Sequence, residues 1–272
     1  MEKGEKMAVS DNHDIDELMQ FAKEAVRSAG EAALSHYAKA RPDVRFDGGL
    51  ITEAELHLNR LFQNRLGAQF PHHQVYNNTQ EVKKYTHEAE RYLWIYDALD
   101  GVANFQAGIP VWGTSLALLE NSWPILGVFH MPVTGDLFYA EAGGKAFWGE
   151  KEIEVSGEED INEDSLLLTY SRFHNHYGST FPGKIRDLGC TSAHICYVAS
   201  GCAEAAIIAN ETYEGLTAGR VIIEAAGGII CRMDGSEFFL NHYLNGDRID
   251  ETLMVVSPEI YHGIRGYLHI NE

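Results

Sequence analysis

The sequence has few residues of several kinds, and each shortage excludes a class of protein. Its 272 residues include 7 prolines, 4 cysteines and only 21 basic residues against 40 acidic ones, which gives a formal net charge of −19. This acidic excess opposes binding to a phosphate backbone, so nucleic acid is not expected as a direct ligand. No apolar run approaches the roughly 20 residues of a membrane-spanning helix, and residues 1–14 lack the apolar centre of a signal peptide. We expect a cytoplasmic protein with no membrane partner.

The four cysteines do not have the spacing typical of a disulfide framework or a zinc site. Cys190, Cys196 and Cys202 follow one another at intervals of six within an apolar segment, and no C-x-x-C pair is present. This spacing favours reduced, buried thiols. A composition of 45% hydrophobic and 11% aromatic residues is typical of an ordered globular protein. The charged run at 157–165 predicts a boundary between two lobes, 10–156 and 166–272.

Periodicity predicts helices first, then strands, then an alternation of both. Apolar residues recur at helical spacing from Ile15 to Tyr37, and a second helix is predicted to begin near Thr52, where Thr-x-x-Glu is the capping-box pattern. The short apolar runs YLWIYDA, TSLALLE, PILGVFHM and LFYAEA are separated by turn residues and predict a meandering sheet. Helices are expected at 192–206 and 216–228. The order indicates a layered α/β or α+β architecture.

Asp97 and Asp100 follow the apolar run YLWIY and lie next to Gly101. Two carboxylates and the Leu99 carbonyl at the end of a strand offer oxygen ligands that suit Mg²⁺. An Asp-x-x-Asp-Gly turn, in which the carboxylates cap backbone N–H groups, has the same spacing and is the commoner structure. Spacing alone favours the turn.

Longer motifs change this balance. WIYDALDGVANFQAGIPVWGTSLAL resembles the D-P-[IL]-D-G-T-x-N-F signature of the inositol monophosphatase family and the sequence that follows it. Leu50–Thr52 resembles the family's L-V-T, FPHHQV its F-P-x-H-x-[IV], CYVASG its C-Y-V-A-x-G, and AGRVIIEAAGG its A-G-x-x-[LI]-[IV]-x-E-A-G-G. The motifs occur in the family's order from about residue 15 to 260, so the chain is identified as a member.

The resemblance implies a five-layered α/β/α/β/α sandwich of the inositol monophosphatase and sugar phosphatase type, usually a homodimer. It implies a Mg²⁺-dependent phosphomonoesterase that acts on phosphorylated polyols or sugars by two-metal catalysis. Carried over by position, Asp97 would bridge two cations, the Leu99 carbonyl would bind the first and Asp100 the second. The phosphate and substrate would contact Gly101, Val102 and Thr191.

Several positions depart from the family's pattern. The family's G-E-E glutamate, a metal ligand, is replaced by Asn78, and the aspartate of its W-D-x-A-A-G by Gly215. Its D-G-T threonine, which orients the attacking water, is replaced by Val102, which can neither donate nor accept a proton. The threonine's acidic partner falls on Glu55, which with Asp97 and Asp100 completes the set of catalytic candidates. Substitute ligands, if any, would be Glu214 or Glu81.

Three hypotheses follow from these departures. The chain is a catalytically impaired or inactive member that still binds a phosphorylated polyol or sugar, with weak Mg²⁺ binding, or a protein partner. Alternatively, it is an active Mg²⁺-dependent phosphatase with substitute ligands, or a non-catalytic assembly or regulatory subunit. The losses fall on metal ligands and on the water-orienting hydroxyl, which favours the impaired enzyme.

Overall fold

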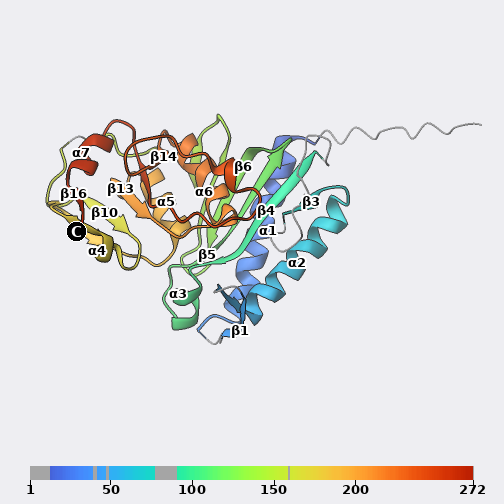
Figure 1. Ribbon diagram of the computed structural model, residues 1–272. Coiled ribbons are helices and arrows are strands. Elements are labelled where there is room, and N and C mark those ends of the chain that lie inside the picture. The colour runs from blue at the N-terminus through green and yellow to red at the C-terminus, as the bar shows by residue number, and fades with distance from the viewer. Residues whose placement is uncertain (1–12, 39–41, 47–48, 77–90, 159, 272) are drawn as a thin grey trace, which may run out of the picture.

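Helices and sheets alternate in five layers in the computed structural model, which describes residues 13–38, 42–46, 49–76, 91–158 and 160–271 (Figure 1). The first layer holds α1 (Ile15–Leu34) and α2 (Glu53–Gln69). Asp14 caps α1 by accepting a hydrogen bond from the backbone N–H of Asp16, and the helix buries its predicted apolar face. The hairpin of β1 (Pro42–Phe46) and β2 (Gly49–Thr52) precedes α2.

The second layer is a seven-stranded sheet in which six strands form an antiparallel meander. These are β4 (Tyr92–Asp100), β5 (Gly113–Glu120), β6 (Trp123–Met131), β7 (Asp136–Glu141), β8 (Ala146–Trp148) and β9 (Lys151–Ile153). The short β3 (Gln74–Val75) pairs in parallel with β4 at the edge. The four predicted strands are confirmed as β4 to β7, with one change. β4 continues through Asp97 to Asp100, where the chain was expected to have already turned.

The third layer, α5 (Thr191–Ala199) and α6 (Tyr213–Ala225), lies between the two large sheets. The prediction of one helix over 192–206 was wrong at its end. α5 ends at Ala199, Gly201 adopts the left-handed conformation with φ 68°, and the chain then enters β13 (Ala205–Ile208). The helix predicted over 216–228 is confirmed as α6, which begins three residues earlier, at Tyr213.

The fourth layer is a five-stranded sheet with the order β12-β10-β13-β15-β14. Its strands are β10 (Leu166–Thr169), β12 (Lys184–Arg186), β13, β14 (Ile229–Arg232) and β15 (Leu253–Val256). β10 pairs in parallel with both neighbours and the remaining pairs are antiparallel. The fifth layer comprises α4 (Phe173–His176) and α7 (Tyr261–Gly266), beside the two-stranded sheet of β11 (Tyr177–Ser179) and β16 (Leu268–Ile270). A 3₁₀ turn spans Leu240–Tyr243. The predicted layered α/β architecture is confirmed.

The largest apolar core lies between the two sheets. It unites buried residues of both sheets, such as Phe138 and Leu253, with residues of α5 and α6, such as Ile195 and Ile222. This core includes residues from both predicted lobes, 10–156 and 166–272. The division of the chain into these two lobes stays a prediction. No helix among the described residues is both long and apolar enough to cross a bilayer.

The four cysteines carry free thiols, as predicted, but they are not all buried. Cys190, Cys196 and Cys231 are buried and Cys202 is exposed. Cys202 follows the left-handed Gly201, in the exposed turn between α5 and β13. The prediction of burial was therefore wrong for Cys202.

Candidate functional site

The end of β4 places Asp97 and Asp100 together. β4 pairs with β5 through Asp97 opposite Ser115 and Asp100 opposite Gly113, with a register irregularity between the two pairs. In a regular strand, residues three apart point to opposite faces, and a bulge changes this alternation. The two carboxylates are close enough that the charge of Asp100 raises the pKa of Asp97, second only to burial as a cause.

Asp97 lies in the irregular end of β4, where it caps a backbone N–H and also belongs to an acidic cluster. Its Oδ1 accepts a hydrogen bond of 3.2 Å from the backbone N–H of Leu99, as the turn interpretation predicts. Burial, Asp100, Glu214 and Glu55 together hold the pKa of Asp97 well above its usual range, against the lowering effect of the Leu99 N–H. Carboxylates from β4, α2 and α6 are thus near enough to Asp97 for their charges to act on it. A turn does not need this accumulation of like charge.

Asp100 joins β4 to α5. Its Oδ2 accepts a hydrogen bond of 2.6 Å from the backbone N–H of Ser192, in the first turn of α5. The N-cap residue of that helix, Cys190, makes no side-chain capping bond, so Asp100 supplies the acceptor. Burial and the charge of Asp100 raise the pKa of the Cys190 thiol, which therefore stays protonated.

The loop after β4 leads directly into α3 (Val102–Ala107). Gly101, its N-cap, has φ 82°, and a Cβ there would lie 3.0 Å from the Val111 carbonyl oxygen and 3.2 Å from the Cys190 Cβ. The site therefore requires glycine at this position. Val102 presents an isopropyl group at the first position of α3. Asn104 fixes the loop by donating hydrogen bonds of 2.7 Å each to the carbonyls of Val111 and Leu188.

The opposite side of the site is formed by the starts of α5 and α6. The hydroxyl of Thr191 donates a hydrogen bond of 2.7 Å to Oε1 of Glu211, a residue that the sequence analysis did not single out. Burial, followed by the charge of Asp100, raises the pKa of Glu211 to about 8. Thr191, predicted to contact substrate, thus orients a carboxylate in this structure.

Gly215 lies in the first turn of α6 and faces this carboxylate. Its backbone N–H donates a 3.1 Å hydrogen bond to Oγ1 of the N-cap Thr212. A Cβ at Gly215 would lie 3.5 Å from Oε2 of Glu211 and 3.9 Å from Oδ2 of Asp97. An aspartate at position 215 would therefore start beside Asp97, as the resemblance implies, and the carboxylate of Glu211 borders the same space.

The remaining predicted residues are only partly brought together. Glu55, in the first turn of α2, and Glu214, in the first turn of α6, both act on the charge state of Asp97. Glu214 is hydrogen-bonded to the side chain of Thr212, the N-cap residue of α6. Asn78 and Glu81 lie outside the described residues.

The donor set suits a small, hard cation. Asp97, Asp100 and the Leu99 carbonyl offer only oxygen, and Mg²⁺ is commonly held by one or two carboxylates while it keeps several waters. The space beside Gly215, bordered by oxygens of Asp97, Glu211 and Thr212, is polar on several sides. As the side chains stand, no group of three or more His, Cys, Asp or Glu residues in the described part of the chain is close enough to enclose a metal. Two carboxylates and one carbonyl fit a single Mg²⁺ that keeps most of its waters.

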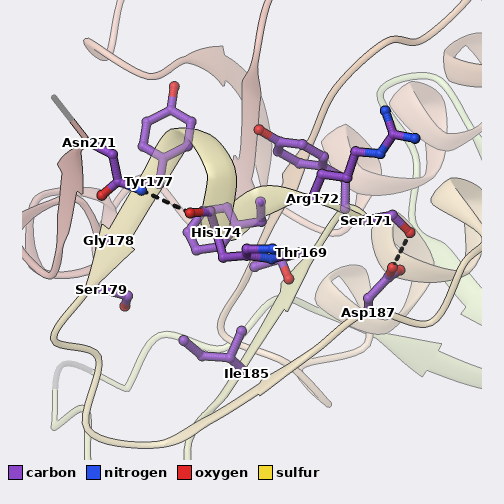
Figure 2. Close-up of a pocket in the computed structure, with 12 residues that line it drawn as sticks. Thr169, Ser171, Arg172, His174, Tyr177, Gly178, Ser179, Ile185, Asp187 and Asn271 are labelled. Carbon is purple, nitrogen blue, oxygen red and sulfur yellow. Dashed lines mark hydrogen bonds between the residues drawn. The ribbon is translucent and has the colours of Figure 1, made fainter.

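A cavity of about 640 Å³ opens between β10, α4, β11 and β12, at the edge of the five-stranded sheet (Figure 2). Asp187 and Ser171, hydrogen-bonded to each other at 2.5 Å, line it, together with Arg172. Asp187 also accepts a 2.8 Å hydrogen bond from the backbone N–H of Gly189, directly before α5. Arg172 has φ 71°, a strained conformation for a residue with a side chain, of the kind often found at binding sites.

Comparison with known proteins gives one family. Residues 14–252 match the inositol monophosphatase family. The chain is 25% identical over 257 residues to the fructose-1,6-bisphosphatase/inositol-1-monophosphatase of Thermotoga maritima. This match covers 91% of this chain and 98% of the relative. It is 30% identical over 201 residues to inositol monophosphatase 2 of Saccharomyces cerevisiae, and this match covers 66% of this chain and 68% of the relative.

Solved structures agree on the fold. An IMPase from Thermotoga maritima superposes with a TM-score of 0.76 at 23% identity and covers 92% of this chain and 96% of its own. The extragenic suppressor protein suhB of Bartonella henselae gives the same TM-score at 19% identity, with 92% and 98% covered. The five-layered sandwich of the resemblance is thereby confirmed.

Proposed function

Because the chain belongs to the inositol monophosphatase family, we propose that it binds a phosphorylated polyol or sugar together with Mg²⁺ and hydrolyses the phosphomonoester only slowly. The observation that carries this proposal is the contrast between the two sides of one site. Asp97 and Asp100 at the end of β4, with Gly101 after them, form an acidic side of the site, whereas Val102 and Gly215 contribute no polar side chain to it.

The residues of this chain would divide the work of binding. Asp97, Asp100 and the Leu99 carbonyl would hold the cation, which when bound supplies positive charge to neutralise the phosphate and the leaving oxygen. The phosphate would lie against the backbone N–H groups of Gly101 and Val102, a contact that needs no particular side chain at position 102. Gly101, which has no room for a Cβ, keeps this backbone close to the ligand.

Hydrolysis requires more than binding. A water molecule must lose a proton as it attacks phosphorus, and a hydroxyl at position 102 would orient that water in the family's arrangement. Val102 has no group that can take part in proton transfer. Loss of such a group costs on the order of 10² to 10⁴ in rate. The charge of Glu55 acts on Asp97 from α2, and position 102 adds no hydroxyl beside it.

The polyol or sugar would extend toward the cavity of Figure 2. Its Ser171–Asp187 pair and Arg172 offer hydrogen-bonding groups suited to hydroxyls, and Asp187 is bonded to the backbone of Gly189, the residue before the N-cap of α5. We propose further that the protein is cytoplasmic and that, as the resemblance implies, it is a homodimer.

Turnover measurements test the proposal. The purified chain with millimolar Mg²⁺ should hydrolyse inositol 1-phosphate and common sugar phosphates at least about 10³-fold more slowly than an intact family member assayed in parallel. Inositol 1-phosphate should still raise the melting temperature in Mg²⁺. Turnover within tenfold of the intact member would instead support an active phosphatase, and no shift with any phosphorylated polyol would favour an assembly subunit.

A further inference from the structure

We propose that Glu211 supplies the carboxylate that position 215 lacks, and that it completes the coordination of the cation held by Asp97 and Asp100. This inference rests on the proposed function, because it concerns the same cation. It assigns a ligand to a residue that neither the signature motifs nor the spacing of acids in the sequence identifies.

The geometry around Gly215 carries the inference. The point where a Cβ of residue 215 would stand is 3.5 Å from Oε2 of Glu211 and 3.9 Å from Oδ2 of Asp97. An aspartate at 215 would place its carboxylate in the space bordered by these two oxygens. Without a side chain at 215, that space is open to the longer side chain of Glu211, which approaches it from the residue before the N-cap of α6.

The backbone of Glu211 is fixed at both of its hydrogen-bonding groups. Its N–H donates to the Ile249 carbonyl at 3.2 Å, and its carbonyl accepts from the Ile249 N–H at 3.0 Å. The hydroxyl of Thr191 holds Oε1 at 2.7 Å, while Oε2 is the oxygen nearest Gly215. A ligand held by a second side chain in this way binds a cation with less loss of conformational freedom.

Glu211 is better placed for this role than the acid next to Gly215. The carboxylate of Glu214 is hydrogen-bonded to the side chain of Thr212 and to the backbone N–H of its own residue, whereas Oε2 of Glu211 lies 3.5 Å from the Gly215 Cβ position. Asp97, Asp100 and Glu211 do not yet enclose a metal as they stand. A rotation of the Glu211 side chain about its fixed backbone, toward Asp97, is the movement that the inference requires.

Cation binding, rather than turnover, tests the inference. The full chain is titrated with Mn²⁺, followed by electron paramagnetic resonance, and with Mg²⁺ by calorimetry. Glu211→Gln should weaken binding at least about tenfold, because even a residue behind a ligand commonly contributes 10- to 100-fold. Glu224→Gln, which removes an exposed carboxylate from the last turns of α6, is the matched control and should bind like wild type. Glu211→Gln combined with Gly215→Asp should recover most of the lost affinity, since the new carboxylate starts beside Asp97.

The outcomes separate the two proposals. Wild-type protein that binds neither cation overturns the proposed function, and this inference with it. Wild-type binding that is unchanged in Glu211→Gln overturns only the inference, as does an equal or larger loss in Glu214→Gln. If Glu211→Gln does not fold, as judged by circular dichroism, Glu211→Asp replaces it. The shorter acid keeps the charge but does not reach the space beside Gly215, so it should also weaken binding.

Discussion

The carboxylate of Asp100 accepts a 2.6 Å hydrogen bond from the backbone N–H of Ser192, so an acid at the end of a strand caps a helix that comes much later in the chain. The same carboxylate raises the pKa of Asp97 and of Glu211. Asp100 is therefore at once a structural cap and the centre of a repelling acidic cluster. A cation near it would relieve repulsion without breaking the cap.

Asp100→Asn separates these two roles. The amide oxygen can still accept from Ser192, whereas the charge is lost. We expect the melting temperature of the variant in EDTA to equal or exceed that of wild type. Mg²⁺ at ten times its Kd should stabilise wild type by about 1.4 kcal/mol, a shift of a few degrees, and should not stabilise Asp100→Asn. Melting curves at constant ionic strength measure this, with the exposed Asp160→Asn as the control. Equal Mg²⁺ shifts in wild type and Asp100→Asn would contradict a cation at this cluster.

Gly101→Ala tests the fit of the turn. The φ of 82° and the 3.0 Å approach to the Val111 carbonyl should together make the variant less stable by about 2 to 4 kcal/mol. Gly135→Ala is the matched control, because Gly135 has φ 80° and no atom within 4 Å of its Cβ position. It should lose only about 1 to 2 kcal/mol, the conformational cost alone. Urea denaturation compares the two, and equal losses would mean that the turn can move aside.

The sequence predicts most of the fold because its signals are local. Turn residues bound the strands β4 to β7, and α1 has a capping Asp14 and an apolar stripe. The end of α5 was mispredicted for the same reason. The residues after Ala199 have helix-compatible composition, and only the left-handed Gly201 and the pairing of β13 with its neighbours end the helix there.

Sequence reasoning reached only those residues of the candidate site that stand within or beside recognisable motifs. Asp97, Leu99 and Asp100 stand within one motif. Glu211 was missed because its relation to Gly215 depends on the bridge to Ile249 and on the hydroxyl of Thr191, and neither contact leaves a periodic signal. The one available signal is that an acid precedes the N-cap Thr212 of the helix that lacks its expected aspartate.

His130 provides a pH-dependent contribution to stability away from the site. Burial lowers its pKa, against the raising effect of a hydrogen bond with the Val26 backbone; Arg27 lowers it further, and Asp136 and Glu31 raise it. With the folded-state pKa below the ordinary value of about 6.5, the unfolded chain takes up a proton first. Stability is therefore present above pH 6.5 and falls as the pH drops below it. Chemical denaturation at pH 7.5 and 5.5 should show a smaller loss in His130→Gln than in wild type. An identical pH dependence in the two proteins would contradict the assignment.

Restoring the family's residues tests whether the loss of activity is local. The triple variant Asn78→Glu, Val102→Thr and Gly215→Asp should gain measurable Mg²⁺-dependent hydrolysis of inositol 1-phosphate, because Asp97, Asp100 and Gly101 are already in place. Each single change should achieve little, since residues that act on one reacting centre are not additive. If Glu211 already replaces the carboxylate of position 215, Asn78→Glu with Val102→Thr alone should recover most of the activity of the triple variant.

The hydroxyl at position 102 is the decisive group in this series. Threonine has nearly the shape of valine, so Val102→Thr adds a hydroxyl with little change in packing, although Val102 is partly buried against the core beneath α3. A second triple variant that carries Val102→Ala with the other two changes removes bulk without adding a hydroxyl, and it should stay inactive. Initial rates with and without EDTA distinguish the two triples. Activity in the alanine version equal to that in the threonine version would assign the defect to steric bulk rather than to proton transfer. No gain in either, in proteins that remain folded by circular dichroism, would mean that the defect extends beyond these three positions.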